Sequence, residues 1–595
     1  MSTILNYTKG LIKEHHLAII FFFIVGFISV APQILSIRAL GNDYQGIHFI
    51  YIDDEVTYMT AIRDILDGHW LSGSPFFYEY KYLKSVVLPW GNYFYALPTL
   101  ITGFSLVNIL IISKFLFPAG LFILIYLLIK KLIGDGGNNF LVKISAVSGG
   151  LFATLGYDLL DYKWAWSFLS GKIMDVHLLI WTRPVNPITG ALLVFIFLLS
   201  TWSIINKRRP IYAILTTGLL LGLMTYYFFS WGIAAAILGS LIAVCLFRKK
   251  YREAVALTAI GIINFLVSLP FWFNVLKNIG STGGNKQMER MGMFFTHVPV
   301  INKILFATAL FFIPSLIYEF LKRKKEGTKI EDWWWFCLAL LLGGVVVFNQ
   351  QVVTGRTIWY YHFVQYTIPL SIVILIVWLF NFVRPKLRIL SGTIICVIAL
   401  ASLAIGIRTA FSYVYVIDDF RRLQNYGYVI NWLNKNAPQD CVVLVKEEGE
   451  ELVNLIPAFT HCNVYVSPWV FEGVPEDRNY HNYLTLLRIR GVEKNAVHDY
   501  LVNHQLEVRD YFFNNWNEHF SKVYDSSVDK EIATLDARYQ IFIKEDFGVL
   551  LKKFRLNYIV AAGDLKETVK KQLLGLQYID NSNALYIYKF NPRAE

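Results

Sequence analysis

Three acidic side chains, Asp53, Asp54 and Glu55, stand together directly after the first hydrophobic stretch of the chain. A capping role explains one of them, because an Asp at a helix N-terminus accepts backbone N–H bonds and an acid in the first turn opposes the helix dipole. Capping does not explain three acids in a row beside a membrane, where charge is costly unless it serves a site. The excess of negative charge therefore indicates a functional site.

The residues that follow the acids predict an amphipathic helix. Apolar side chains recur there at helical spacing, namely Tyr58, Ile62 and Ile65 with Met59, Leu66 and Trp70. The acids thus head a helix, and we expect Asp53 to be its cap.

The composition assigns most of the chain to a membrane. Hydrophobic residues make up 55% of the 595 residues, charged residues only 16%, and the mean hydropathy is +0.45. An ordinary water-soluble core does not reach these values. The net charge of +12 comes from short Lys and Arg clusters between apolar stretches, which indicate membrane topology rather than a nucleic-acid groove. We predict a polytopic helical membrane protein that contacts membrane lipids and binds no nucleic acid.

About eleven apolar stretches are long enough to span a bilayer. They lie at roughly 17–38, 106–129, 140–160, 187–205, 211–228, 230–247, 254–275, 303–321, 333–348, 364–383 and 389–409. Basic clusters follow alternate stretches, which predicts a cytoplasmic N-terminus and an extracytoplasmic C-terminus. The only N-x-S/T triplet, at residues 6–8, is on the cytoplasmic side, which favours a prokaryotic plasma (inner) membrane. The first stretch precedes no small-residue cleavage site, so we expect it to be retained. The segment 92–103 is short and aromatic and is predicted to lie at the interface.

The chain changes to a soluble composition at about Phe411. Strand-like runs at 441–445, 463–466, 558–561 and 585–588 alternate with helical patterns, which predicts a partly parallel sheet. We therefore expect a transmembrane domain over residues 1–410, with an outer loop at 39–105, and an extracytoplasmic α/β domain over residues 411–595. Of the five cysteines, Cys441 and Cys462 are the pair that could form a single disulfide.

The acidic stretch fits the pattern D-E-x-x-Y-x-x-x-A/I-x-x-x-x-x-G through Asp54, Glu55, Tyr58, Ile62 and Gly68. This pattern, after one span and at the start of a long outer loop, resembles the GT-C superfamily of integral-membrane glycosyltransferases. Aminoarabinose-transferase-like and protein O-mannosyltransferase-like members are the most similar. The later order of features is similar as far as about residue 280, but the K-P-P motif of many members is replaced here by KYLKSVVLPWGNYFY.

The resemblance implies transfer of a sugar from a polyprenyl-phosphate carrier to an acceptor at the outer face, with inversion, using the acid of the first loop. An acceptor hydroxyl needs a carboxylate to take its proton, and nearby negative charge stabilises an oxocarbenium-like transition state. We assign Asp54 as the general base and Glu55 as a supporting or acceptor-binding residue. The acceptor is a glycan, a lipid or a protein.

The leaving lipid phosphate needs cations to hold its growing charge. The candidates are basic residues near predicted span ends, which could equally be interfacial anchors, namely Lys81, Lys84, Arg183, Arg290, Arg356 and His362. Arg183 and Asn186 belong to a Pro-bounded turn, 181–187, and His362 to an unusually polar connection, 349–363. Both segments suit carbohydrate or phosphate binding.

A second acidic position is expected after the third span. Asp158, Asp161 and Asp175 are available there, followed by His177. Asp158 and Asp161 are one helical turn apart and could share a face. They are the solvated end of a helix or, together with Asp54, oxygen ligands of a divalent metal.

Two other functions compete with sugar transfer. Polar residues within spans are also found in transporters and flippases of lipid-linked substrates, although the chain shows no internal repeat. Alternatively, the soluble domain is the main actor and the spans are a platform for surface-polymer assembly.

Overall fold

The computed structural model describes residues 2–591 except 51–52, 72, 84–87, 135–139, 172–178, 208, 280–292, 294, 358, 447–450, 468–473 and 514–524. The chain divides into two compact units. Unit 1 comprises Met1–Ala39, Val107–Phe271 and Thr296–Ile417. Unit 2 comprises Leu40–Leu106, Trp272–Phe295 and Asp418–Glu595.

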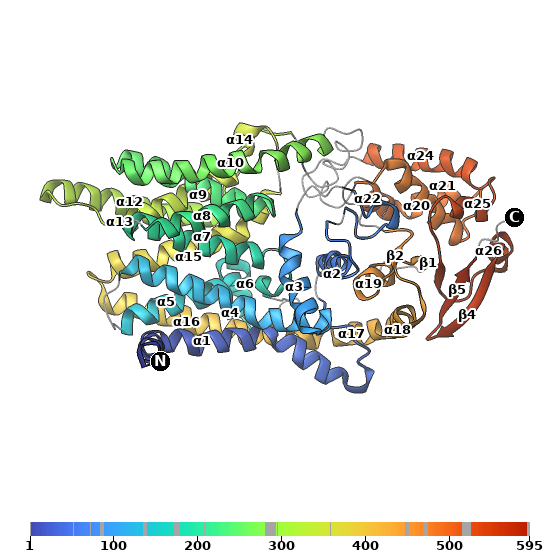
Figure 1. The fold of residues 1–595 in the computed structure, drawn as a ribbon, viewed down its shortest axis with the longest axis horizontal. Helices are drawn as coiled ribbons and strands as arrows, with labels where there is room; N and C mark the ends of the chain where they lie inside the picture. Colours follow the sequence, from blue (N-terminus) through green and yellow to red (C-terminus); the bar gives the residue numbers. More distant parts are fainter. Residues whose placement is uncertain are drawn as a thin grey trace. The chain divides into compact units, whose positions relative to one another are not determined.

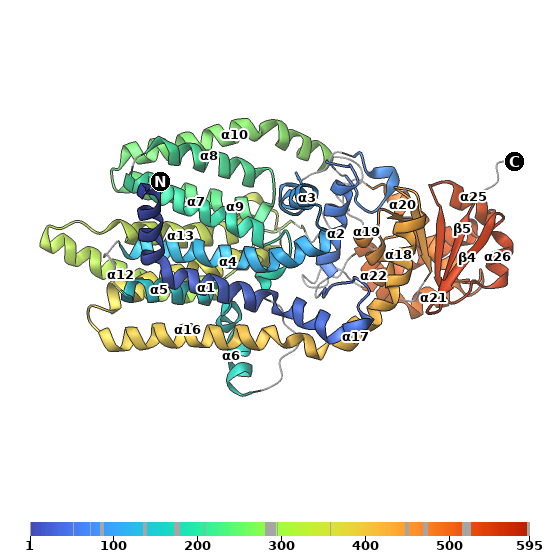
Figure 2. The ribbon, with the colours of Figure 1, turned by 60° about the horizontal axis from the view of Figure 1, so that its bottom comes forward.

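Unit 1 is a bundle of apolar helices that run side by side (Figures 1 and 2). Its helices are α1 (Ser2–Leu40), α4 (Leu106–Ile133), α5 (Phe140–Thr154), α6 (Tyr162–Leu169), α7 (Ile188–Lys207), α8 (Pro210–Met224), α9 (Phe228–Phe247), α10 (Tyr251–Ile279), α12 (Lys303–Glu326), α13 (Asp332–Phe348), α14 (Gln351–Thr354), α15 (Val364–Trp378) and α16 (Arg388–Ala410).

Among the described residues, eight helices have the length and apolar composition to cross a membrane, and α5, α8 and α13 are shorter apolar helices. Together they occupy the positions of the eleven stretches expected from hydropathy. The prediction of a polytopic helical membrane protein is therefore confirmed, while the count of about eleven spans stays a prediction.

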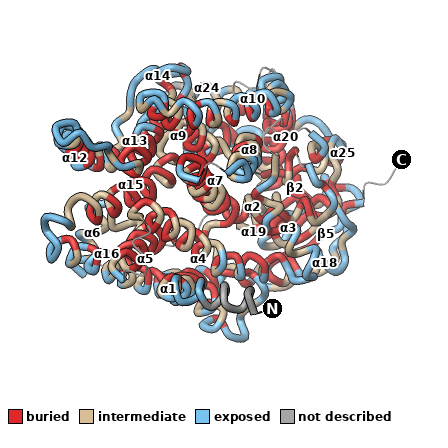
Figure 3. Tube along the Cα trace, turned by 60° about the vertical axis from the view of Figure 1, so that its left-hand side comes forward, coloured by how far each residue is buried: buried red, intermediate tan, exposed pale blue. Residues whose placement is uncertain are grey.

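Burial separates central helices from peripheral ones. We compared the most apolar 18 residues of each long helix. In the segment Tyr360–Val383, 78% of these residues are buried, and in α7 72% are buried. In α10, α12 and α16 only 28% are buried. Figure 3 shows the same contrast, with buried residues along α7 and α15 and exposed ones along α12. Lipid tails are as apolar as a protein core, so the peripheral helices can expose Leu and Ile to them.

Close backbone approach and side-chain hydrogen bonds hold the bundle together, as expected where the hydrophobic effect does not drive helix association. A Cβ at Gly343 of α13 would lie 2.5 Å from Ile237 Cγ1 of α9. Ser200 of α7 hydrogen-bonds Thr216 of α8 at 2.7 Å. Ser148 of α5 donates to the Ile395 carbonyl of α16 at 2.9 Å.

Unit 2 contains a five-stranded mixed sheet with the order β2-β1-β3-β5-β4. The strands are β1 (Val442–Lys446), β2 (Asn463–Val464), β3 (Tyr558–Ala562), β4 (Leu576–Ser582) and β5 (Leu585–Phe590). β1 pairs in parallel with β2 and β3, whereas β5 pairs antiparallel with β3 and β4. The four expected strands and the partly parallel sheet are confirmed. β4 was not expected, because a bulge between Tyr578 and Asp580 interrupts its alternation.

Helices cover both faces of this sheet (Figure 1). The helices of the C-terminal segment are α17 (Ile417–Leu423), α18 (Gly427–Asn436), α19 (Glu451–Phe459), α20 (Glu476–Ile489), α21 (Val497–Asn503), α22 (Gln505–Phe513), α24 (Asp525–Phe542), α25 (Phe547–Lys552) and α26 (Glu567–Gln572). One apolar core includes Val442, Leu444 and Ile559, and the other includes Val443, Val445 and Val560. Alternation along each strand thus serves both faces.

The loop between α1 and α4 belongs to unit 2, whereas the sequence-based division groups it with the transmembrane domain. It contributes α2 (Asp53–Leu66) and α3 (Trp90–Thr102). Phe76 and Phe77 are 2% and 0% exposed, in the apolar core that includes β1 and β3. Ile47 packs with Ile430 and Leu455 of the C-terminal segment. This apolar burial explains why the loop clusters with the C-terminal segment.

Candidate functional site

The acidic stretch heads α2, as expected. Met59, Ile62 and Ile65 are 0–1% exposed, so one side of the helix is anchored in the core of unit 2. Asp53 is the first helical residue, which agrees with an N-terminal position, and its side chain lies outside the described part. Asp54 is partly exposed. It lies in the first turn of this helix.

Glu55 differs from Asp54 in its surroundings. Its side chain is 3% exposed, and its Oε1 lies 3.1 Å from Nε2 of His48, which is fully buried. A buried carboxylate is costly unless it is paired, and the imidazole supplies that partner. Sequence analysis did not single out His48, because a lone His carries no spacing signal. The pair supports a structural role for Glu55 beside a more accessible Asp54.

Lys81, expected near the donor phosphate, is 4% exposed and pairs with Asp64 of α2. Asp440 Oδ1 lies 3.8 Å from the same Nζ. The charge of Lys81 is thus compensated by carboxylates of its own unit. Donor-phosphate binding by Lys81 stays a prediction, and Lys84 and Arg290 lie outside the described residues.

In unit 1, the Pro-bounded turn meets the connection between α8 and α9. The Tyr226 hydroxyl donates to Asn186 Oδ1 and lies 3.0 Å from Thr189 Oγ1. Asn186 and Thr189 flank the start of α7, and Tyr226 follows the end of α8. The Pro-bounded turn and the end of the predicted apolar stretch 211–228 therefore lie together.

The polar connection after α13 joins the same group. The Tyr227 hydroxyl lies 3.1 Å from His362 Nδ1. The His362 ring stacks on Phe229 and Trp359, with ring centroids 4.8 and 5.3 Å apart. Arg183 lies in the neighbourhood of His362. The result is a polar cluster with aromatic walls, which we call the Tyr227–His362 cluster.

Asp158 approaches the Pro-bounded turn through its neighbour Tyr157. The Tyr157 ring packs edge-on against Trp181 at 5.8 Å, and the Trp181 indole donates to the Ala153 carbonyl at 2.7 Å. α5 ends at Thr154, so Asp158 lies in the turn that follows the helix. Burial, and to a smaller extent the Asp161 carboxylate, raises the pKa of Asp158 to about 6.

Asp161 has a separate task. Its Oδ1 accepts the backbone N–H of Lys163 at 2.9 Å and so caps α6, and its side chain is exposed. This is the helix-end alternative that the sequence left open. Arg356 is also exposed. Asp175 and His177 lie outside the described residues.

No group of three or more His, Cys, Asp or Glu side chains in the described part of the chain is arranged to hold a metal ion. Asp158 and Asp161 belong to unit 1 and Asp54 to unit 2. Asp161 is engaged as a cap, and a divalent metal held by Asp54, Asp158 and Asp161 stays a prediction.

Cys441 and Cys462 form a disulfide in unit 2, as the sequence allowed. It joins the residue before β1 to the residue before β2 and so ties the starts of two parallel strands. The other cysteines are free.

Comparison with known proteins gives one fold neighbour to report. No protein-family model matches the sequence, and no curated protein matches it. The crystal structure of the Archaeoglobus fulgidus oligosaccharyltransferase, in complex with Zn and sulfate, is similar at a TM-score of 0.44 and 12% identity. The match covers 91% of this chain and 67% of that one. A TM-score below 0.5 carries no argument about function, which therefore rests on this chain's own residues.

The structure has the two parts predicted from the sequence. It combines a polytopic bundle of apolar helices with a C-terminal α/β sheet domain. The candidate site residues fall into two groups, the α2 acids in unit 2 and the Tyr227–His362 cluster with Asp158 in unit 1.

Proposed function

We propose that this protein is a membrane glycosyltransferase. It moves a sugar from a polyprenyl-phosphate-linked donor to an acceptor at the extracytoplasmic face, with inversion and with Asp54 as general base. The observation that carries the proposal is the Tyr227–His362 cluster, in which Tyr227 and His362 lie 3.1 Å apart beside two stacked aromatic rings.

The chemistry of this cluster suits a lipid-phosphate sugar. Arg183 offers a permanent cation with several donors for phosphate oxygens, and tyrosine hydroxyls and the imidazole offer further polar partners. Phe229 and Trp359 supply ring surface. The three segments involved are connections at ends of apolar helices, and the ends of membrane spans face lipid head groups. A basic residue here stabilises the charge that grows on the departing phosphate.

Asp54 fits the role of base better than its neighbour. Glu55 is buried against His48, whereas Asp54 is partly exposed in the first turn of α2. In the transfer, the acceptor oxygen forms a bond to the anomeric carbon while the bond from that carbon to the phosphate oxygen breaks. The acceptor proton passes to the Asp54 carboxylate, and the electron pair of the broken bond leaves on the polyprenyl phosphate. No acid is needed, because the phosphate leaves as an anion.

Asp158 is the second acidic residue of the proposal. It carries a pKa of about 6 beside the Pro-bounded turn. A carboxyl group of this kind exchanges its proton near neutral pH, so it can donate a hydrogen bond to a sugar hydroxyl or accept one. We assign it to sugar or acceptor binding. The protein resides in the plasma (inner) membrane with its N-terminus in the cytoplasm, and its acceptor is a glycan, a lipid or a protein.

The test uses the full chain in lipid nanodiscs. Mass spectrometry first identifies any lipid-linked sugar that co-purifies, and a panel of polyprenyl-phosphate hexoses is then supplied as donors. We expect release of polyprenyl phosphate with sugar transferred to added acceptors, and Asp54→Asn to reduce the rate by at least a hundredfold. Asp477→Asn is the control, because Asp477 is 89% exposed in the same unit. Normal turnover by Asp54→Asn, or movement of intact donor across the bilayer without bond cleavage, would overturn the proposal.

A further inference from the structure

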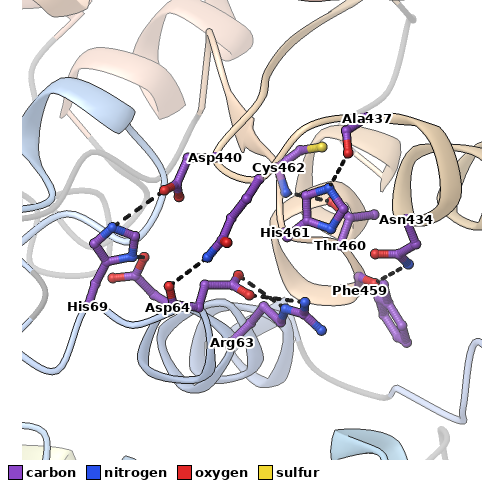
Figure 4. Close-up of polar contacts among 12 residues, drawn as sticks. Arg63, Asp64, His69, Asn434, Ala437, Asp440, Phe459, Thr460, His461 and Cys462 are labelled. Carbon is purple, nitrogen blue, oxygen red and sulfur yellow. Dashed lines mark hydrogen bonds and ion pairs between the residues drawn. The ribbon is translucent and has the colours of Figure 1, made fainter.

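Four ionisable side chains meet near the C-terminal end of α2, and we call them the Asp64–Asp440 ring. Lys81 Nζ and His69 Nδ1 both contact Asp64 Oδ1, the latter at 3.3 Å. Asp440 faces the same two residues, with Oδ2 3.7 Å from His69 Nε2 and Oδ1 3.8 Å from Lys81 Nζ. Figure 4 shows His69 between the two carboxylates. All four belong to unit 2.

Three of the four side chains of the ring are buried. The side chains of Asp64, Lys81 and His69 are 1%, 4% and 6% exposed, and Asp440 is 21% exposed. Taking such charges out of water costs several kcal/mol per ion unless partners compensate it, and removing one partner of a buried pair is strongly destabilising. Each carboxylate here has two nitrogen partners and each nitrogen-bearing side chain has two carboxylates. The members therefore depend on one another.

A second contact ties the same two segments together. Gln439 Nε2 donates to the Asp67 carbonyl at 2.8 Å, just after α2 ends. Arg63 holds the Asp67 side chain at 3.0 Å. The ring and this bond thus attach one end of α2 to the short segment that precedes β1.

That segment is itself held by the sheet. Asp440 has a φ of +57°, a left-handed conformation that Asp tolerates better than most residues. Its N–H donates to the His461 carbonyl at 3.1 Å, and the next residue, Cys441, is disulfide-bonded to Cys462. Several contacts thus hold Asp440 in a sparsely populated backbone conformation. Such conformations are concentrated at functional sites.

We propose that the Asp64–Asp440 ring is a positioning device, which fixes α2 on the sheet of unit 2 and so sets where the Asp54 carboxylate lies. Asp54 and Asp64 are at opposite ends of one 14-residue helix, which spans about 21 Å. A tilt at the ring therefore displaces the base, and a displacement of about 1 Å can cost a hundredfold in rate. Lys81 is then a positioning residue and not a ligand of the donor phosphate. The effect on turnover rests on the proposed function, whereas the effect on the helix does not.

Kinetics separate positioning from phosphate binding. The variants are Lys81→Met, Asp440→Asn and the double variant, with a polyprenyl-phosphate hexose as donor. We expect each single variant to lower kcat roughly tenfold or more with the donor KM within about twofold, because a misplaced base slows the chemical step alone. The double variant should be no slower than the slower single variant, because both break one ring. Lys553→Met, at a Lys that is 49% exposed, is the control.

A rise in donor KM for Lys81→Met with normal kinetics for Asp440→Asn would overturn the proposal, because it would make Lys81 a direct phosphate ligand. Amide hydrogen exchange gives a readout that does not need activity. Exchange should rise in residues 53–66 and 437–441 of both single variants and stay unchanged in β4 and β5. Unchanged exchange in α2, or a rise throughout unit 2, would each contradict positioning. If the wild-type chain transfers no sugar, the proposed function is wrong. Hydrogen exchange would then still show whether the ring positions α2.

Discussion

His48 Nε2 lies 3.1 Å from Glu55 Oε1, and both side chains are buried. The neighbouring Asp54 is partly exposed. Two adjacent acids at the start of α2 are therefore in different environments. Glu55 pairs with a buried histidine, whereas Asp54 is partly exposed.

The first prediction separates these two acids. Glu55→Ala should lower the free energy of unfolding by about 1–3 kcal/mol, because it leaves the buried His48 without its carboxylate. Asp54→Asn should change it by less than about 0.5 kcal/mol, as partly exposed substitutions usually do, while it abolishes turnover. Thermal unfolding in nanodiscs, together with donor cleavage, measures both. Equal destabilisation by the two variants would refute the distinction.

The second prediction concerns the Tyr227–His362 cluster. Tyr227→Phe removes the hydroxyl that lies 3.1 Å from His362 Nδ1 and leaves the ring in place. We expect the donor KM to rise about fivefold, which corresponds to the loss of one hydrogen bond of about 1 kcal/mol that orients the imidazole. Tyr318→Phe, at a residue of α12 that is 52% exposed, is the control. If the two variants had the same donor KM, the Tyr227–His362 cluster would not be part of the donor site.

The third prediction concerns acid stability in unit 2. His481 Nε2 lies 2.8 Å from the Tyr465 hydroxyl, and burial, with the charges of Arg478 and Lys553, lowers the pKa of His481 to about 3. Because this value is below the unfolded pKa of about 6.5, the unfolded chain binds the extra proton. The stabilisation is complete above pH 6.5 and is lost as the pH falls toward 3.

Between pH 7 and pH 5 the wild-type chain should therefore lose up to about 2 kcal/mol of stability, at most 1.4 kcal/mol per pH unit. The stability of the His481→Gln variant should depend less on pH, because Gln can still accept a hydrogen bond from Tyr465 and does not titrate. His504→Gln, at an exposed histidine, should keep the wild-type slope. Hydrogen exchange in residues 476–489 at both pH values is the measurement, and equal slopes for wild type and His481→Gln would contradict it.

The fourth prediction concerns packing in unit 1. A Cβ at Gly343 would lie 2.5 Å from Ile237 Cγ1 and 2.8 Å from Ile237 Cα, so no side-chain rotation relieves the clash. Gly343→Ala must push α13 away from α9 and should lower stability by about 1–3 kcal/mol. Gly239→Ala, where a Cβ meets nothing within 4 Å, should be neutral or slightly stabilising. A lower melting temperature for Gly239→Ala than for Gly343→Ala would contradict the prediction that the close contact between α13 and α9 at Gly343 determines stability.

Local patterns predicted the helices of the bundle and four of the five strands. Apolar stretches of spanning length predicted the bundle helices, because the burial of such a stretch depends on its own side chains. Strand-like runs such as 558–561 predicted β3 for the same reason. The run of β4 was missed, because its partner β5 and the bulge at Tyr578/Asp580 determine its pairing.

The sequence by itself determined which segments carry chemistry. The acids of α2, the turn at 181–187 and the polar connection at 349–363 each stood out by residue type. It did not determine which side chains meet. Tyr227 and His362 are 135 residues apart, and Lys81 lies 359 positions before Asp440. Only the tertiary structure decided that Glu55 is paired while Asp54 is accessible, and that Lys81 is enclosed by carboxylates. Contact between distant residues depends on how helices and strands pack, and the residue types of one segment do not encode its partner.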